Sequence, residues 1–184
     1  GKQIYNNGDI CEGDFKDGNF EGKGKMVLAG NIIEGDFKDG SLDGKGKIIF
    51  AGGNVYEGDF KNGKLEGKGK KTLNNGNIYE GDFKAGNLEG KGKMVFKDGD
   101  AYEGDFKEGN LEGKGTIIFA DGNIYEGDWK NASAEGKGKM IFADGQIYEG
   151  DWKDNKPNGI GKARYADGSV YEGEFKNGTR VTKG

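Results

Sequence analysis

The chain has 184 residues, of which 39 are glycine and 32% are hydrophobic, and its 28 basic residues are set against 32 acidic ones. Charges of both signs alternate along the whole chain, so it lacks the basic cluster that binds nucleic acid or anionic lipid. With no histidine and a single cysteine, Cys11, it has neither a disulfide framework nor a cysteine-based metal site. No apolar run approaches the roughly 20 residues that a membrane-spanning helix needs.

A glutamate–glycine pair, usually preceded by tyrosine, recurs eight times at an almost constant interval. The first step is 22 residues and the next six are 23, with the glutamates at Glu12, Glu34, Glu57, Glu80, Glu103, Glu126, Glu149 and Glu172. A fixed period of this length predicts a repeat protein, in which each unit buries its apolar face against its neighbours. We therefore expect residues 1–184 to form a single array. Because Gly1 and Gly184 fall at the same phase of the repeat, we expect that array to be a segment of a longer protein.

Residues 55–78 illustrate the unit. Residues 55–61 alternate in type, as a strand with one apolar face does. Asn62-Gly63 is typical of a tight two-residue hairpin turn, a second alternating segment runs from Gly67 to Leu73, and residues 74–76 fit a three-residue loop with a left-handed glycine. Glycines within both segments disfavour a helix. The unit is therefore predicted to be a β-hairpin with rings on one face and ions on the other.

Two strand registers follow from the two turns. A two-residue turn at Asn62-Gly63 would pair Tyr56 with Gly69, Gly58 with Gly67, and Glu57 with Lys68. A three-residue loop at residues 74–76 would pair Lys70 with Glu80, Lys68 with Asp82, and Gly67 with Phe83. Both place glycines beside rings that need room, and lysines between carboxylates.

These residues resemble the MORN repeat (membrane occupation and recognition nexus), whose pattern is clearest at residues 171–178, Tyr-Glu-Gly-Glu-Phe-Lys-Asn-Gly. The resemblance covers the whole chain. It implies an all-β fold: an elongated, single-layer antiparallel sheet of about eight tandem hairpins, gently twisted, with an aromatic-lined groove. It also implies a non-catalytic role in scaffolding, self-association or the binding of a partner peptide. Some members of the family are linked to phosphoinositides and junctional membranes.

The chain departs from this pattern in several places. Cys11 and Ile33 occupy tyrosine positions, and the second repeat is one residue short at Ala29-Gly30, where we expect a bulge or an altered turn with a change of face parity. Two further departures concern charge. Ile160 replaces a lysine, and the residue before the Gly-x-Gly pair of the second strand, such as Glu66 before Gly67, is acidic, which weakens the lipid-binding hypothesis. The turns at residues 131–134 and 154–157 lack Asn-Gly. The last copy of the repeat, at residues 177–182, lacks the first glycine of its second strand.

The open stripe of rings is the main functional clue. Trp129 and Trp152 fill the phenylalanine position in adjacent repeats with unusual turns, and tryptophan is a favoured anchor in binding sites. The alternative explanation is that tryptophan replaces phenylalanine within the stripe without any role in binding. We predict that a partner-binding groove is lined by Tyr102, Phe106, Tyr125, Trp129, Tyr148, Trp152, Tyr171 and Phe175.

The preferred hypothesis is a scaffold that takes a protein or peptide partner in this groove, or that forms a homo-oligomer through its terminal strands. The alternative is a peripheral module that binds anionic, phosphoinositide-containing membrane through its lysines, although these lysines are matched by carboxylates. We expect no nucleic-acid partner, enzyme activity, cofactor, catalytic residue or metal site, since the Glu-Gly-Asp and Gly-x-Gly patterns fit neither calcium nor nucleotide motifs. The expected location is cytoplasmic, at a membrane or the cytoskeleton.

Overall fold

A computed structural model describes residues 1–182, which contain seventeen β-strands and no helix. The strands are β1 (Lys2–Ile4), β2 (Ile10–Lys16), β3 (Asn19–Leu28), β4 (Asn31–Lys38), β5 (Ser41–Ile49), β6 (Val55–Lys61), β7 (Lys64–Thr72), β8 (Ile78–Lys84), β9 (Asn87–Val95), β10 (Ala101–Lys107), β11 (Asn110–Ile118), β12 (Ile124–Lys130), β13 (Ser133–Ile141), β14 (Ile147–Lys153), β15 (Lys156–Arg164), β16 (Val170–Lys176) and β17 (Thr179–Arg180).

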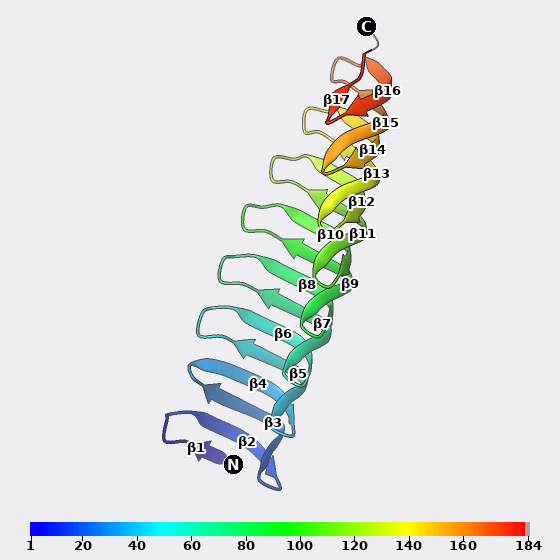
Figure 1. Cartoon of the computed structure of the whole chain (residues 1–184). Coiled ribbons are helices and arrows are strands. Elements are labelled where there is room, and N and C mark those ends of the chain that lie inside the picture. Colours follow the sequence, from blue (N-terminus) through cyan, green and yellow to red (C-terminus); the bar gives the residue numbers. More distant parts are fainter. Residues whose placement is uncertain (183–184) are drawn as a thin grey trace. The chain divides into compact units, whose positions relative to one another are not determined.

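The chain divides into two compact units, which we call unit 1 (residues 1–90) and unit 2 (from residue 91). Unit 1 holds β1 to β8 and the start of β9, and unit 2 holds the remainder of β9 and β10 to β17. Within each unit, consecutive strands pair antiparallel and the hairpins follow one another in chain order as a single layer (Figure 1). The predicted all-β fold of tandem hairpins is confirmed. A single array over residues 1–184 stays a prediction.

The register predicted from the three-residue loop is correct. Across β7 and β8, Lys70 pairs with Glu80, Lys68 with Asp82, and Gly67 with Phe83. The backbone N–H of Leu73 donates to the carbonyl of Asn77 at 2.9 Å and so encloses residues 74–76, with Gly76 at a left-handed φ of 92°. The glycine of the loop therefore supplies the conformation that its position requires.

The register predicted from the two-residue turn is wrong. Next to the turn, Phe60 pairs with Leu65 as expected, but Gly58 pairs with Gly69 and not with Gly67. A bulge lies between these pairs, where β7 contributes residues 66–68 against Asp59 alone. Similar shifts occur in the hairpins β2–β3, β4–β5, β10–β11, β12–β13 and β14–β15.

The aspartate of the repeat stabilises this bulge. In β10–β11, the Asp105 carboxylate accepts the backbone N–H of Lys114 at 3.1 Å, directly after Gly113 at a left-handed φ of 76°. Its other oxygen pairs with Lys91 Nζ at 2.6 Å. Equivalent bonds to the backbone N–H are made by Asp36, Asp128 and Asp151. Alternation alone could not predict this geometry, because the extra residues interrupt the two-residue period.

The shortened second repeat has an altered turn, as expected, but no change of face parity. β3 and β4 are joined by a two-residue turn at Ala29-Gly30, with φ values of 48° and 80°. Met26 still pairs with Ile33, as Ile48 pairs with Tyr56 in the next repeat. Parity is kept because the missing residue comes from the loop tip, beyond the last paired positions.

The two faces of each sheet differ as predicted. The face that carries the tyrosine, phenylalanine and tryptophan rings, here called the ring face, holds most of the buried hydrophobic side chains. The opposite face, here called the charge face, carries ion pairs such as Lys45–Asp59 and Lys68–Asp82, at 2.6 and 2.7 Å. These lysines are about three-quarters exposed, so each pair contributes roughly 0.2–1 kcal/mol. Ile160, which replaces a lysine of this row, is 61% exposed.

The acidic residue before the glycine pair joins successive hairpins. The Glu66 carboxylate accepts the backbone N–H of Ala85 at 2.8 Å, and that of Glu112 accepts the N–H of Asn131 at 3.1 Å. Each bond satisfies a donor in the turn of the next hairpin. A basic residue here could not accept these bonds, so the departure from the family pattern has a structural reason.

Candidate functional site

The structure brings together all eight residues predicted to line the groove. They come from β10, β12, β14 and β16 and form one ladder of edge-to-face rings on the ring face of unit 2. Ring centroids are 4.8–5.4 Å apart and the planes meet at 74–90°. The order of contact is Phe106, Tyr102, Trp129, Tyr125, Trp152, Tyr148, Phe175 and Tyr171.

Most of this ladder is buried within the protein itself. Tyr102 is 0% exposed, Tyr125 1%, and the two indoles, Trp129 and Trp152, 8% and 5%. Each indole N–H already donates a hydrogen bond: that of Trp129 to the carbonyl of Gly115 at 3.1 Å, and that of Trp152 to the carbonyl of Gly138 at 3.0 Å. The rings therefore form the core of unit 2, and their role in binding a partner stays a prediction.

The tyrosine hydroxyls of unit 2 are fixed by a recurrent hydrogen bond. Tyr102, Tyr125 and Tyr148 each donate to the carbonyl of the aspartate three residues later, at 3.2, 3.0 and 2.9 Å. Burial, with a further contribution from that aspartate's charge, raises the pKa of Tyr102 and Tyr148 to about 12. The pKa of Tyr125 is also raised, again chiefly by burial. We call this arrangement the docked state of the tyrosine.

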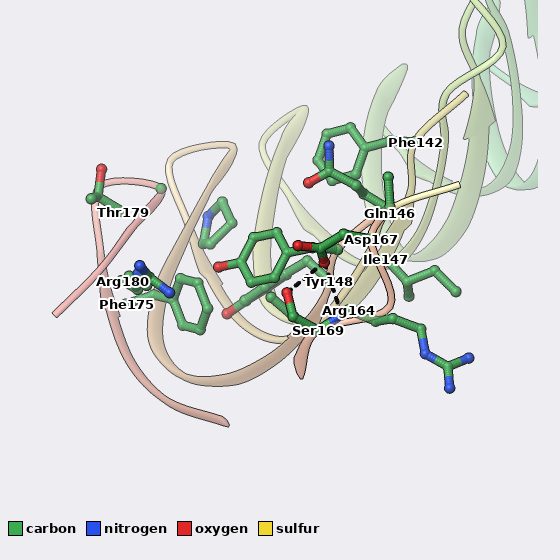
Figure 2. Close-up of a pocket in the computed structure, with 15 residues that line it drawn as sticks. Phe142, Gln146, Ile147, Tyr148, Arg164, Asp167, Ser169, Phe175, Thr179 and Arg180 are labelled. Atoms are coloured by element: carbon green, nitrogen blue, oxygen red, sulfur yellow. Dashed lines mark hydrogen bonds between the residues drawn. The ribbon is translucent and has the colours of Figure 1, made fainter. Parts of the chain in front are cut away.

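A hollow of about 730 Å³ opens on the ring face near the end of unit 2. Tyr148, Phe175 and Ala163, three buried residues, belong to its lining. Figure 2 shows Phe142 and Arg180 at opposite sides of the hollow. Phe142 is 37% exposed. Two of the predicted groove residues thus border space that a partner can reach.

Polar groups also line this hollow. Ser169 donates its hydroxyl to the Asp167 carboxylate at 2.6 Å, and Gln146 lies in the same lining. The guanidinium of Arg180 lies 5.9 Å from the Tyr171 ring centroid. An apolar floor with a few polar groups around it is the usual composition of a binding site. The sequence analysis did not assign these residues to the site, because they lie in the loops between hairpins and in β17, outside the stripe of rings.

The tyrosines of unit 1 are in a different state. Tyr56 and Tyr79 are half-buried, and Lys71 of β7 pairs with both of them across the neighbouring strands. Lys71 Nζ lies 4.7 Å from the Tyr56 ring centroid and 5.5 Å from that of Phe83. It also donates a hydrogen bond to the carbonyl of Gly86. We call this arrangement the open state of the tyrosine.

Lys71 is a candidate site residue that the sequence analysis missed. At the corresponding position the other repeats carry Met26, Ile48, Met94, Ile117, Met140 and Ala163. A comparison of this one position at the 23-residue period would have revealed the charged exception, and the register predicted from the three-residue loop places it opposite Tyr79.

Within residues 1–182, no group of three or more Asp, Glu, Cys or His residues could hold a metal ion. No helix in this range is long and apolar enough to cross a membrane. The carboxylates of the charge face are engaged by lysines and backbone N–H groups, as Asp105 and Asp128 show.

Comparison with known families gives a clear result. The MORN repeat matches residues 11–31, 34–55, 56–78, 79–101, 102–124, 125–147, 148–170 and 171–181. The chain belongs to the MORN repeat family. MORN repeats are typical of non-catalytic repeat scaffolds, and the tandem hairpins described above agree with that class.

Comparison with individual proteins adds no functional assignment. No curated protein matches the chain. The TCP domain of SAS-4 from Drosophila melanogaster, solved with a proline-rich motif of Ana2, is similar at 18% identity and a TM-score of 0.48, over 82% of this chain and 76% of that domain. The TCP10 domain of Danio rerio CPAP is similar at 13% identity and a TM-score of 0.34, over 94% and 93%. Likeness at this level carries no argument about partners.

Proposed function

We propose that this MORN-repeat protein is a non-catalytic scaffold that binds a protein or peptide on the ring face of unit 2, or associates with a second copy there. The hollow near the end of unit 2 is the observation that supports this proposal most directly. It combines accessible volume, the predicted groove rings Tyr148 and Phe175, and the exposed ring of Phe142. A partner residue placed there would cover apolar surface without disturbing the buried ladder.

The buried ladder supports the proposal in a second way. Seven of its eight rings are at most 8% exposed, so the floor of the site is rigid before a partner arrives. A rigid site loses little conformational entropy on binding. In this proposal the eight predicted residues act chiefly as the base of the site, and the partner contacts Tyr148, Phe175 and the rim.

The test uses rim residues because alanine at the buried rings would also destabilise the sheet. Phe142→Asp places a charge in the hollow, and Val170→Asp places the same charge at a residue that is 53% exposed and outside the lining. Each variant is immobilised, incubated with extract from the native source, and compared with the unmodified protein by quantitative mass spectrometry. We expect specific partners to be lost with Phe142→Asp only. Equal capture by both variants would refute the proposal.

Self-association is distinguished by sedimentation of the purified protein over a range of concentrations. If the partner is a second copy, we expect a concentration-dependent rise in sedimentation coefficient that Phe142→Asp abolishes and Val170→Asp leaves in place. A monomer at all concentrations, together with the loss of captured proteins, would identify a heterologous partner.

A peripheral membrane module is the second candidate. The observation that favours it is the exposure of lysine side chains on the charge face of each unit: 73–84% for Lys23, Lys45 and Lys68 in unit 1, and 71–73% for Lys91, Lys114 and Lys137 in unit 2. Each of these lysines already pairs with a carboxylate, so a phosphate group would have to displace an aspartate. Sedimentation with phosphoinositide-containing vesicles at low and high salt tests this candidate. Failure to sediment at low salt would exclude it. A location at membranes or the cytoskeleton stays part of the proposal.

A further inference from the structure

Lys71 is an anomaly in the ring face of unit 1. The position faces the aromatic stripe, and six other repeats fill it with methionine, isoleucine or alanine. Burial lowers the pKa of the Lys71 ammonium, which means that the charged form is disfavoured at this place. A methionine would pack here without that cost, so packing alone does not explain the lysine.

The ammonium group of Lys71 retains unused hydrogen-bonding capacity. It donates one hydrogen bond to the carbonyl of Gly86 and lies over the rings of Tyr56 and Phe83. A lysine has three N–H donors, and ring faces do not replace a carboxylate as their acceptor. Among the residues that the structure describes, Lys71 forms no ion pair, in contrast to the lysines of the charge face.

The tyrosines on both sides of Lys71 are open. Tyr56 and Tyr79 are half-buried, whereas Tyr102, Tyr125 and Tyr148 of unit 2 are at most 3% exposed. Within residues 1–182, every buried polar side-chain atom has a hydrogen-bond partner, and the hydroxyls of Tyr56 and Tyr79 have none, so both hydroxyls reach the surface. The ammonium therefore lies beside an open tyrosine ring, that of Tyr56, on an apolar surface that also includes the ring of Phe50, 4.8 Å from that of Tyr56.

We infer that the ring face around Lys71 recognises an aspartate or glutamate side chain of an extended peptide, with apolar residues on either side of that acid. The ammonium would donate to the carboxylate, and the neighbouring rings of Tyr56 and Phe83 would cover the apolar residues. This inference rests on the proposed scaffold function and adds the chemistry of one partner segment. The site lies wholly within unit 1, so it is separate from the hollow in unit 2.

A random-peptide library displayed on phage tests the inference without a known partner. The library is selected on the full chain and on three variants: Lys71→Met, Lys71→Arg and Lys70→Met. Lys71→Met keeps the packing, because methionine is the residue at this position in three other repeats. Lys70 lies on the charge face, paired with Glu57 and Glu80, so Lys70→Met removes the same charge without touching the site. Selected peptides are then synthesised with the acid and with its amide counterpart.

We expect the unmodified protein, Lys70→Met and Lys71→Arg to select peptides in which an acidic residue is flanked by apolar ones. The affinity of these peptides should fall about tenfold with Lys71→Met, and by a similar factor when the acid is replaced by its amide. Peptides that bind Lys71→Met and their own amide counterparts with unchanged affinity would overturn the inference. If those peptides are instead lost with Phe142→Asp, the proposed scaffold function stands and only this inference falls. A library that yields no binder to any form would also overturn this inference, while the capture experiment with Phe142→Asp and Val170→Asp decides the scaffold function separately.

Discussion

In unit 2 each docked tyrosine ring packs over a pair of strand glycines, and the substitution Gly138→Ala, which adds one methyl group, tests this packing. Gly138 has no left-handed φ, so alanine is compatible with its backbone conformation. A Cβ there would nevertheless lie only 2.6 Å from Cε2 of Tyr125 and closer still to its hydroxyl. Because Tyr125 is 1% exposed and held on both sides by tryptophan, the ring has to leave its place.

The cost of Gly138→Ala follows from what Tyr125 loses. Its hydrogen bond to the carbonyl of Asp128, at 3.0 Å, contributes about 1 kcal/mol. Each of its edge-to-face contacts, with Trp129 at 5.2 Å and Trp152 at 4.8 Å, contributes about 0.5–1.5 kcal/mol. We therefore expect the variant to lose about 3 kcal/mol of unfolding free energy, which corresponds to a fall in melting temperature of roughly 6–12 °C for a chain of this size.

Thermal unfolding followed by tryptophan fluorescence measures this effect, since both indoles contact the displaced ring. Gly52→Ala is the matched control: Gly52 also lacks a left-handed φ, and a Cβ there would meet nothing within 4 Å. The control should melt within about 2 °C of the unmodified protein, or slightly higher, because alanine reduces the entropy of the unfolded chain. A melting temperature for Gly138→Ala equal to that of the control would refute the docked packing of Tyr125.

Three further predictions concern charge and turn geometry. The pKa values of Tyr102 and Tyr148 are raised from 10.0 to about 12, so their contribution to stability should be complete below pH 10 and be lost between pH 10 and 12. Tyrosinate absorbance during alkaline unfolding measures this change. Ionisation of both tyrosines near pH 10 in the folded protein would contradict their burial. Ala132 has a left-handed φ of 62°, so Ala132→Gly should raise the unfolding free energy by about 0.5–1 kcal/mol in urea denaturation, and a loss of stability would show that the turn is unstrained. Ile160→Lys should restore an ion pair with Glu174 and add up to about 0.5 kcal/mol at low salt, with no gain at high salt; a gain independent of salt would argue against an ion pair.

Much of the fold was predictable because the repeat reveals its own geometry. The alternation of residues 55–61 predicted a strand with rings on one face, and the loop at residues 74–76 predicted the pairing of Lys68 with Asp82. The composition also indicated correctly that lysines and carboxylates would face each other. What failed was the register across Asn62-Gly63, because residues 66–68 bulge opposite Asp59, and no two-residue period reveals such a bulge.

The candidate site was predictable as a set of rings, but their burial was not. The sequence identified Trp129 and Trp152 as unusual members of the stripe, and their contacts with Tyr102 and Tyr125 follow from the period. Whether such rings face solvent or one another depends on how each sheet curves and on which side chains lie opposite. The rim of the hollow was not predicted either: Arg180 occupies a position that differs between repeats, whereas the position of Phe142 also carries a ring at Phe96 and Phe119, so the period alone does not single it out.

Two identical hexapeptides show where local sequence stops being decisive. Residues 79–84 and 102–107 both read Tyr-Glu-Gly-Asp-Phe-Lys, and the sequence alone determined that both form strands with the tyrosine on the ring face. Only the tertiary structure decided that Tyr102 is docked and Tyr79 is open. The physical reason lies in the neighbouring strands: the ammonium of Lys71, opposite Tyr79 in the preceding strand, must keep contact with polar atoms, whereas Ile117, opposite Tyr102 in the following strand, is apolar and can be sealed beneath a ring.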